Sequence, residues 1–458
     1  MNERVGELKK NTFLIAIATI GSRAISFILA PLYSFYLTTE QYGMMDLIAT
    51  TCSLIGPFIC LDIYESTFRF TKDDKFNNKK VITTSLIICL LMMVVCLFAL
   101  GGYSLIKPLT TSIVICAFSA MIDSLNNTVS QYARGKDEIS VFAFSGILSS
   151  IAVFGLNILF LIALKMELTG WMISFILSKI IVLLYLIVKL KLWNDIYFDL
   201  FDKKFLKEGL MFSLPLMPSA SMWWIMNASD RYILNEYWGI AATGIYAAAI
   251  KLPSILSVLE SVFYQAWQTT AIDTLQEKER DNFYSNIFLN YFRLLSIGVV
   301  GILLILKPLF LTLFAKDYSS GWECAAILVV GVMIHALGGN IGVLYTVFKG
   351  TKGALKTSFI GAVVNIILNL IFVPRFGMIA AACTTFISYI FVLGVRWFDI
   401  KKYVKINFII KRELLTVIFI LCSFILYYVP GNMSYGIRSV MFLYCLYINK
   451  EIIATVMR

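Results

Sequence analysis

Charged residues interrupt the long apolar runs of this sequence, and their types indicate what they could bind. Three basic residues lie deep in such runs, namely Arg23, Lys179 and Lys251. A cation within the hydrocarbon core of a bilayer is costly, and it usually faces the protein interior or a water-filled cavity. Arginine suits phosphate groups because its planar guanidinium binds two oxygens at once. We therefore expect the three residues to contact an anion, with an ion pair to Asp123 or Glu260 as the alternative for Arg23.

Three acidic residues and one histidine lie in other apolar runs. They are Asp62, near the end of the second run, Asp123 in the fourth, Glu260 in the eighth and His335, the sole histidine, in the tenth. Buried carboxylates titrate and bind cations, so a coupling ion or a proton is one expectation. The other expectation is that these groups are counter-charges for the basic residues. For His335, a packed neutral imidazole and a proton relay both remain open.

Uncharged polar residues and helix breakers complete the set of candidates. Asn365 and Asn369 are four residues apart and share one helix face, where hydrogen bonds between helices or substrate contact would explain them. Asp230 is a further polar candidate for a cavity, or it closes a helix end together with Arg231. The candidate flexing points are Pro31, Pro215, Pro218, Gly338 and Gly339.

The composition excludes a soluble globular protein. Of the 458 residues, 59% are hydrophobic and 15% charged, and the mean hydropathy is +0.81. Soluble domains carry about 25% charged residues. The net charge of +11 resides in short segments between the apolar runs, so it does not predict a nucleic-acid partner.

Polar breaks divide the chain into about fourteen membrane-spanning helices. We therefore expect an all-α polytopic membrane protein with two six-helix lobes around a central cavity and a C-terminal helix pair. The expected spans lie near residues 12–37, 43–66, 81–104, 109–132, 139–164, 169–190, 208–229, 239–270, 284–314, 320–347, 354–374, 377–397, 407–429 and 433–455.

The distribution of basic residues predicts the orientation. With the N-terminus in the cytoplasm, about 28 of the 39 Lys and Arg residues fall in cytoplasmic segments and about 7 in external ones. This asymmetry favours an even number of spans and cytoplasmic termini. The resulting domains are an N-terminal lobe (1–190), a cytoplasmic linker (191–207), a second lobe (208–400) and an extra helix pair (401–458).

An internal repeat supports the two lobes. Gly135 and Gly146 align with Gly350 and Gly361 at one common offset, and both lobes break an early apolar helix with proline. Such repeats are typical of transporters.

Motifs of soluble enzymes are missing from the sequence. It has no P-loop, no G-x-S-x-G and no HExxH, and its nine cysteines form no CxxC pair. We therefore expect no enzyme activity, no cofactor and no bound metal.

Several segments together resemble a known family. They are "GSRAISFILAPLYSFYLTTEQYGMMDL", "LKEGLMFSLPLMPSASMWWIMNASDRYILNEYWGIAATGIYAAAIKLPSIL" and "KGTKGALKTSFIGAVVNIILNLIFVPRFGMIAAACTTFISY". In order and spacing they are similar to the polysaccharide-unit flippases of the multidrug/oligosaccharidyl-lipid/polysaccharide (MOP) exporter superfamily. The resemblance covers most of residues 1–400.

This resemblance implies two six-helix bundles around a V-shaped cavity with alternating access. The implied substrate is an undecaprenyl-pyrophosphate-linked oligosaccharide, flipped outward in the bacterial cell membrane for capsule, O-antigen or exopolysaccharide assembly. Arg23 would hold the pyrophosphate, together with Lys179 and Lys251. The implied partners are this lipid, the bilayer and polysaccharide polymerase or ligase machinery. Energy would come from an ion gradient or from removal of the product outside.

Three other functions stay open. A cation-coupled multidrug exporter of the same superfamily would carry a carboxylate in the first span, where this chain has Arg23. A lipid II flippase would also need a cationic cavity. A membrane polysaccharide polymerase or ligase is disfavoured by the short external loops.

Overall fold

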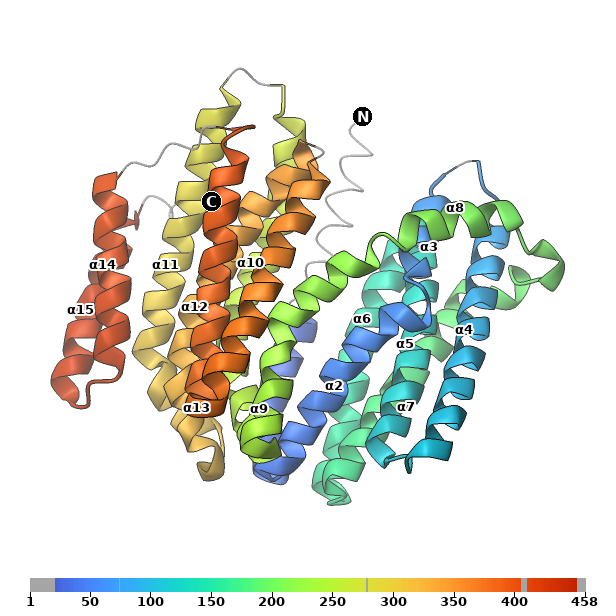
Figure 1. The fold of residues 1–458 in the computed structure, drawn as a ribbon, viewed down its shortest axis with the longest axis horizontal. Helices are drawn as coiled ribbons and strands as arrows, with labels where there is room; N and C mark the ends of the chain where they lie inside the picture. The colour runs from blue at the N-terminus through green and yellow to red at the C-terminus, as the bar shows by residue number, and fades with distance from the viewer. Residues whose placement is uncertain (1–20, 74, 277–278, 349, 405–409, 451–458) are drawn as a thin grey trace. The chain divides into compact units, whose positions relative to one another are not determined.

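The computed structural model describes residues 21–73, 75–276, 279–348, 350–404 and 410–450 (Figure 1). These residues form helices and turns, with no strand among them, which confirms the predicted all-helical class. The chain divides into two compact units. The first unit comprises Met1–Leu37 and Met44–Trp224, and the second comprises Thr38–Gly43 and Ile225–Arg458.

The first unit contains a helix over residues 21–36 and a series of long helices that follow it. Side-chain caps fix where two of them begin, because Asn77 accepts a hydrogen bond from the backbone amide of Lys79 and Thr110 accepts one from that of Ile113. The helices are α2 (Thr39–Ile59, of which the first residues belong to the second unit), α3 (Ile63–Thr71), α4 (Asn78–Ile106), α5 (Thr111–Gly135), α6 (Ile139–Asn157) and α7 (Glu167–Leu190), with a π-helical turn, η1 (Ile158–Ala163), after α6.

Helix α5 is central to the first unit, because it packs against α3, α4, α6 and α7. It buries small polar side chains toward its neighbours, including Ser119, Ser124 and Thr128. Small hydroxyl residues let helices approach closely in a lipid environment, where no hydrophobic effect drives helices together. The sequence of α5 therefore combines close packing with a polar interior.

The segment after α7 is held against the rest of the first unit through Asp195. It contains the short helices η2 (Leu192–Asn194) and η3 (Phe198–Leu200) and the helix α8 (Lys203–Ser213). The Asp195 carboxylate accepts hydrogen bonds from Tyr132 (3.0 Å) and Lys136 (3.1 Å), and Lys79 lies 3.5 Å away. Burial alone would raise the pKa of Asp195, but the hydrogen bonds from Lys136, Tyr132 and Lys79 hold it below its ordinary value.

The second unit contains the remaining helices. They are α9 (Met217–Lys251, of which the first residues belong to the first unit), α10 (Ser254–Asp273), α11 (Arg280–Leu313), α12 (Trp322–Val347), α13 (Thr351–Ile400), α14 (Ile410–Tyr427) and α15 (Asn432–Ile448), with a 3₁₀ turn, η4 (Lys316–Gly321), before α12. Helix α11 packs against α12, α14 and α15.

Helix α13 is a hairpin of two helices. A straight helix of its 50 residues would be about 75 Å long, more than twice the hydrocarbon core of a bilayer. Gly377, with φ 59° and ψ −136°, breaks it instead. The two arms face each other, since Thr384 donates to Asn369 across the turn (2.5 Å). The turn lies between the predicted eleventh and twelfth spans.

Helix α9 bends back in the same way at Gly239, which has φ 81° and ψ 171°. Tyr246 on the second arm donates to Asp230 on the first (2.6 Å). Both turns require a positive φ, which glycine adopts without steric cost. This turn lies at the predicted start of the eighth span.

Eight helices of the described part are long and apolar enough to cross a membrane, or nine if Ser221–Lys251 and Ser254–Ile272 form one bent span. The chain is thus a multi-pass membrane protein. The α13 hairpin is one of the eight although it has two arms, and the apolar part of α14 (Glu413–Tyr427) is too short to be among them. The count of about fourteen spans and the four-part domain division stay predictions. Parts of the first, thirteenth and fourteenth predicted spans (12–20, 407–409 and 451–455) lie outside the described residues.

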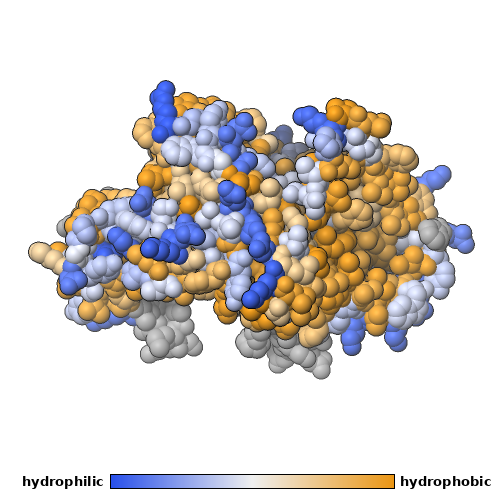
Figure 2. Space-filling model, turned by 90° about the horizontal axis from the view of Figure 1, so that it is seen from below, coloured by the Kyte–Doolittle hydropathy of each residue, from blue (hydrophilic) through white to orange (hydrophobic). Residues whose placement is uncertain are grey.

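Large apolar areas are exposed on the surface (Figure 2). In α4, for example, Leu91, Phe98 and Leu105 are all exposed. Exposed apolar surface on this scale is unusual for a soluble monomer and suits contact with lipid.

Candidate functional site

A cavity of 530 Å³ opens within the first unit, between the helix over residues 21–36 and helices α5, α6 and α7. Three residues that the sequence singled out line it together, namely Arg23, Asp123 and Lys179. The other polar lining residues are Ser22, Asn126, Asn127, Ser130, Ser145, Ser149 and Ser178, and the apolar ones include Phe142, Phe175 and Val182.

Helical periodicity brings these side chains together. Along α5, Asp123, Asn127 and Ser130 follow each other at intervals of four and three residues, so they lie on one face. Along α7, Phe175 and Lys179 do the same. Because α5 and α7 pack against each other, their polar faces meet at the cavity.

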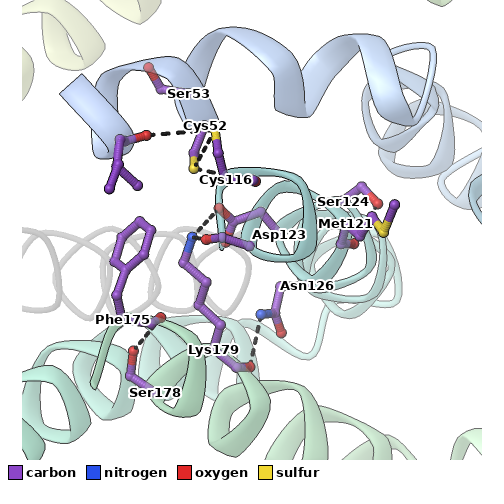
Figure 3. Close-up of polar contacts among 12 residues, drawn as sticks. Cys52, Ser53, Cys116, Met121, Asp123, Ser124, Asn126, Phe175, Ser178 and Lys179 are labelled. Carbon is purple, nitrogen blue, oxygen red and sulfur yellow. Dashed lines mark hydrogen bonds and ion pairs between the residues drawn. The ribbon is translucent and has the colours of Figure 1, made fainter. Parts of the chain in front are cut away.

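Lys179 forms an ion pair with Asp123 at the wall of the cavity (Figure 3). Its Nζ atom lies 2.5 Å from Asp123 Oδ2 and also donates to the Ser119 hydroxyl. It stands 3.8 Å from the centre of the Phe175 ring, a cation–π contact that helps to fix its position. The Lys179 side chain is 12% exposed, whereas that of Asp123 is 32% exposed. The ammonium group is thus largely desolvated and its counter-ion is partly wet.

Two thiols lie in contact beside this ion pair. Cys52 of α2 and Cys116 of α5 are buried, and their sulfur atoms are 3.3 Å apart (Figure 3). Both cysteines are free thiols.

Arg23 is an exposed residue of the cavity lining. Its neighbour Ser22 donates to the carbonyl of Gly146 (3.2 Å), which places this helix turn against α6. No described carboxylate forms an ion pair with Arg23. Asp123 pairs with Lys179 and Glu260 pairs with His335, so neither carboxylate serves as the counter-ion that we considered for Arg23.

The cavity has the composition of an anion site with room for polar groups. Its ionised lining residues are two cations and one carboxylate, and its amides and hydroxyls offer both donors and acceptors. No group of three or more His, Cys, Asp and Glu residues that could hold a metal ion occurs among the described residues.

The remaining titratable candidates lie in the second unit or away from the cavity. His335 Nδ1 on α12 lies 2.9 Å from Glu260 Oε1 on α10. Lys251 is the last residue of α9 and is half-buried. It also interacts with another residue of the structure. Asp62 is buried and precedes α3 in a left-handed conformation (φ 54°).

The uncharged candidates and Asp230 form one network in the second unit. Asp230 accepts from Tyr246 (2.6 Å) and Thr385 (3.4 Å), and Thr385 also accepts from the amide of Asn365. Asn369 donates to Asn365 (3.0 Å). Asp230 and both asparagines are buried, so these groups join the arms of α9 and α13 rather than closing a helix end as isolated residues.

The predicted flexing points differ in their surroundings. Pro31 lies within the helix over residues 21–36, whereas Pro215 lies in the turn between α8 and α9 and Pro218 in the first turn of α9. Gly338 and Gly339 lie inside the uninterrupted helix α12. Their role as hinges stays a prediction.

Three arginines of the second unit were not among the expected site residues: Arg396 and Arg438 are buried, and Arg293 is half-buried. Arg396 donates to Thr357, Ser358 and the carbonyl of Gly338. Arg293 of α11 pairs with the buried Glu413 of α14, and Arg438 of α15 donates to the carbonyl of Leu303. Arg293, Arg396 and Arg438 lie inside the expected spans 284–314, 377–397 and 433–455. A charged residue within an apolar run was the available signal.

Comparisons with known proteins give a consistent assignment. A family model described as "polysaccharide biosynthesis protein" matches residues 8–268. An uncharacterised membrane protein of Methanocaldococcus jannaschii is 27% identical over 255 residues, which are 52% of this chain and 50% of that protein. The chain thus matches about half the length of this relative.

Solved structures of transporters share the fold. The inward closed conformation of the lipid II flippase MurJ has a TM-score of 0.73 at 16% identity, covering 97% of this chain and 100% of that one. A multidrug resistance MATE family transporter of the MOP superfamily gives 0.62 inward-facing and 0.61 outward-facing, both at 16% identity and over 86% of this chain, with 94% and 96% of the transporter covered. At these identities the likeness establishes the fold alone.

Proposed function

Because the chain belongs to the polysaccharide biosynthesis protein family, we propose that it flips a lipid-linked oligosaccharide across the cell membrane. The substrate is an undecaprenyl-pyrophosphate-linked repeat unit, which moves from the inner to the outer leaflet by alternating access. The MOP-superfamily fold supports a transporter, and the family description supports a role in polysaccharide biosynthesis. The product is used for cell-surface polysaccharide such as O-antigen or capsule.

The observation that carries this proposal is the cavity that Arg23 and Lys179 line. A diphosphate bears charge that both side chains can neutralise, and the arginine can contact two oxygens at once. Sugars need many weak hydrogen bonds, which the surrounding serines and asparagines can supply. The pyrophosphate therefore binds at the two cations, and the sugars occupy the polar remainder of the cavity.

The proposal includes a location and partners. The protein lies in the bacterial inner membrane with both termini in the cytoplasm, as the distribution of basic residues predicts. Polymerase or ligase machinery takes up the flipped unit on the outside. Lys251 is a third candidate for the pyrophosphate, although it does not line this cavity.

A lipid II flippase is the second candidate function. It is favoured by the likeness to MurJ over 97% of this chain, and its lipid-linked substrate would meet the same two cations. A carrier of organic cations is disfavoured, because the ionised lining residues sum to a positive charge. The two candidates differ in the attached sugars, which a transport assay with each lipid distinguishes.

Flipping can be measured in proteoliposomes that contain a fluorescent undecaprenyl-pyrophosphate oligosaccharide. We expect the parent protein to expose the lipid to an external quencher, and Arg23→Ala and Lys179→Gln to lose most of this activity. Lys189→Gln is the matched control, because Lys189 is an exposed lysine on the same helix as Lys179 and lies outside the cavity lining.

Each possible result of this assay has a definite meaning. If both cavity variants are folded and flip the lipid as fast as the parent, the cavity does not hold the pyrophosphate. If the parent moves lipid II and not the oligosaccharide lipid, the second function is correct. If the parent moves neither and exports a cationic dye, the proposed substrate class is wrong.

A further inference from the structure

Cys52 and Cys116 are a pair of thiols that the anion cavity does not use. Their sulfur atoms lie 3.3 Å apart, and the two residues are 2% and 6% exposed. Both are free thiols, and Figure 3 shows them side by side. A buried cysteine usually acts as a small apolar residue. Two buried sulfur atoms in contact can also form a covalent bond with each other, because a disulfide needs the two side chains to approach in this way.

The thiols join two helices that lie side by side within the first unit, because one belongs to α2 and the other to α5. Nearer the start of these helices, the Ser112 hydroxyl lies 3.4 Å from the sulfur of Met44. At the end of α2, Ile59 packs in one apolar cluster with Ala120 and Met121 of α5. Contacts on both sides of the thiol pair thus hold the two helices together.

This packing leaves a small movement for bond formation. The sulfur atoms must approach from 3.3 Å to a bond length of about 2.05 Å. We expect rotations of the two side chains to supply this movement, because the helix backbones already lie against each other. The pair is therefore close to the geometry of a disulfide while both thiols are reduced.

A short path links the pair to the anion cavity. Ser119 lies one helical turn after Cys116 on α5, and its hydroxyl accepts a hydrogen bond from the Lys179 ammonium, which lines the cavity. One turn of helix thus separates the thiols from the cavity wall. We expect hydrogen peroxide to reach the thiols, because it is small and uncharged, whereas a bulky or charged reagent stops at the cavity.

We propose that Cys52 and Cys116 form a site of oxidative modification, at which a peroxide converts the two thiols into a disulfide between α2 and α5. In the first step one sulfur attacks hydrogen peroxide, so that an S–O bond forms, the O–O bond breaks and water leaves. In the second step the other sulfur attacks this sulfenic acid, so that the S–S bond forms, the S–O bond breaks and a second water leaves. The thiols lose two electrons and two protons, and one hydrogen peroxide becomes two water molecules.

The disulfide restrains a helix that contains residues of both units. Thr39–Gly43 of α2 belong to the second unit, and the rest of the helix belongs to the first. Alternating access requires the parts of a transporter to move, and a covalent bond to α5 removes freedom of movement from α2. Oxidation should therefore slow flipping, and reduction should restore it. This consequence rests on the proposed function, whereas formation of the disulfide does not.

The disulfide can be detected chemically in nanodiscs. The protein is treated with hydrogen peroxide and denatured, the remaining thiols are alkylated, and mass spectrometry without reduction maps the linked peptides. In the parent we expect a linked peptide pair with Cys52 and Cys116, which dithiothreitol separates. Cys52→Ala should lack this pair. Cys445→Ala is the matched control and should retain it, because it removes a buried thiol that lies beside Asn449 (3.7 Å) in the other unit.

Three results of this mapping overturn the proposal. The first is recovery of both cysteines in alkylated form after the peroxide treatment. The second is oxidation of each to a separate sulfinic acid without a link between them. The third is a link from Cys116 to Cys96, which packs against the same apolar cluster as the ends of the two helices.

The effect on transport is measured in proteoliposomes with the fluorescent lipid. Peroxide should remove most of the flipping activity of the parent, and dithiothreitol should restore it. Cys116→Ala should flip with and without peroxide at equal rates, whereas Cys445→Ala should respond as the parent does. If the parent carries the disulfide and flips as fast as before, the bond does not control transport. If the reduced parent flips no lipid at all, the proposed function fails, and the peptide map still decides whether the disulfide forms.

Discussion

Replacing Asp123 with asparagine should tighten the binding of a diphosphate to the cavity. The Asp123 carboxylate is paired with Lys179, so a diphosphate that binds this lysine lies close to a second negative charge. At an effective dielectric constant of about 20, two unit charges about 6 Å apart interact by about 3 kcal/mol. The carboxylate is 32% exposed, so water screens part of this repulsion. About 1.4 to 2 kcal/mol remains, which corresponds to roughly a 10- to 30-fold gain in affinity.

The same change should weaken the empty protein. Removal of one partner from a buried ion pair leaves an uncompensated charge, at a cost of about 3 to 5 kcal/mol. Inorganic pyrophosphate should restore part of this loss, because a ligand that binds the folded state alone stabilises it by mass action. We therefore expect Asp123→Asn to melt at a lower temperature than the parent and to gain more from pyrophosphate.

Calorimetric titration of purified protein with inorganic pyrophosphate measures the affinity, and Lys179→Gln should lower it. The matched control is Asp137→Asn, which removes a 72%-exposed carboxylate paired with Lys72 outside the cavity. The reasoning is refuted if Asp123→Asn binds pyrophosphate no more tightly than Asp137→Asn. It is also refuted if Lys179→Gln and Asp123→Asn change the affinity in the same direction.

Three further outcomes concern the scaffold. Arg293→Ala should lower the free energy of unfolding by about 3 to 5 kcal/mol, because it leaves the carboxylate of Glu413 buried without a partner. Replacing both residues with leucine should lower it far less, and thermal melts of the two variants measure the difference. Gly244→Ala should destabilise the protein because its Cβ would overlap the backbone of Thr39, which belongs to the same unit. Gly394→Ala, with no atom within 4 Å, should be neutral or stabilising by about 1 kcal/mol, and equal melting temperatures of the two variants would contradict this. Because the pKa of Asp195 is depressed in the folded protein, its carboxylate stabilises the fold at pH values above its unfolded-state pKa of about 3.9. This stabilisation is lost as the pH falls through the pKa of the folded state. Proteolysis of the 191–202 segment should therefore accelerate in acid for the parent, and Asp195→Asn should be cleaved quickly at every pH.

Much of the fold follows from the sequence. The long apolar runs predict a multi-pass helical protein, and the family resemblance is confirmed by the match over residues 8–268. The turns at Gly239 and Gly377 could be predicted because each glycine lies between two apolar runs. The number of spans could not be checked from helix length, since a hairpin without a loop counts as one helix.

The pairing of charges was harder to predict. Lys179 and Asp123 are 56 residues apart, and Glu260 and His335 are 75 apart. Periodicity assigns each residue to a helix face, but only the packing of helices decides which faces meet. The contacts of Arg396 were missed for a related reason, because hydropathy alone does not show which groups a charged residue inside an apolar run meets.

The hairpin form of α13 limits how this part of the gene can vary. The turn at Gly377 has no loop around it that could accommodate a residue inserted into or deleted from either arm. One extra residue would rotate everything beyond it by about 100° and move it by about 1.5 Å. Such a change would separate Asn369 from Thr384 and Arg396 from Ser358 at the same time. We therefore expect this stretch to accept substitutions yet keep its length during evolution.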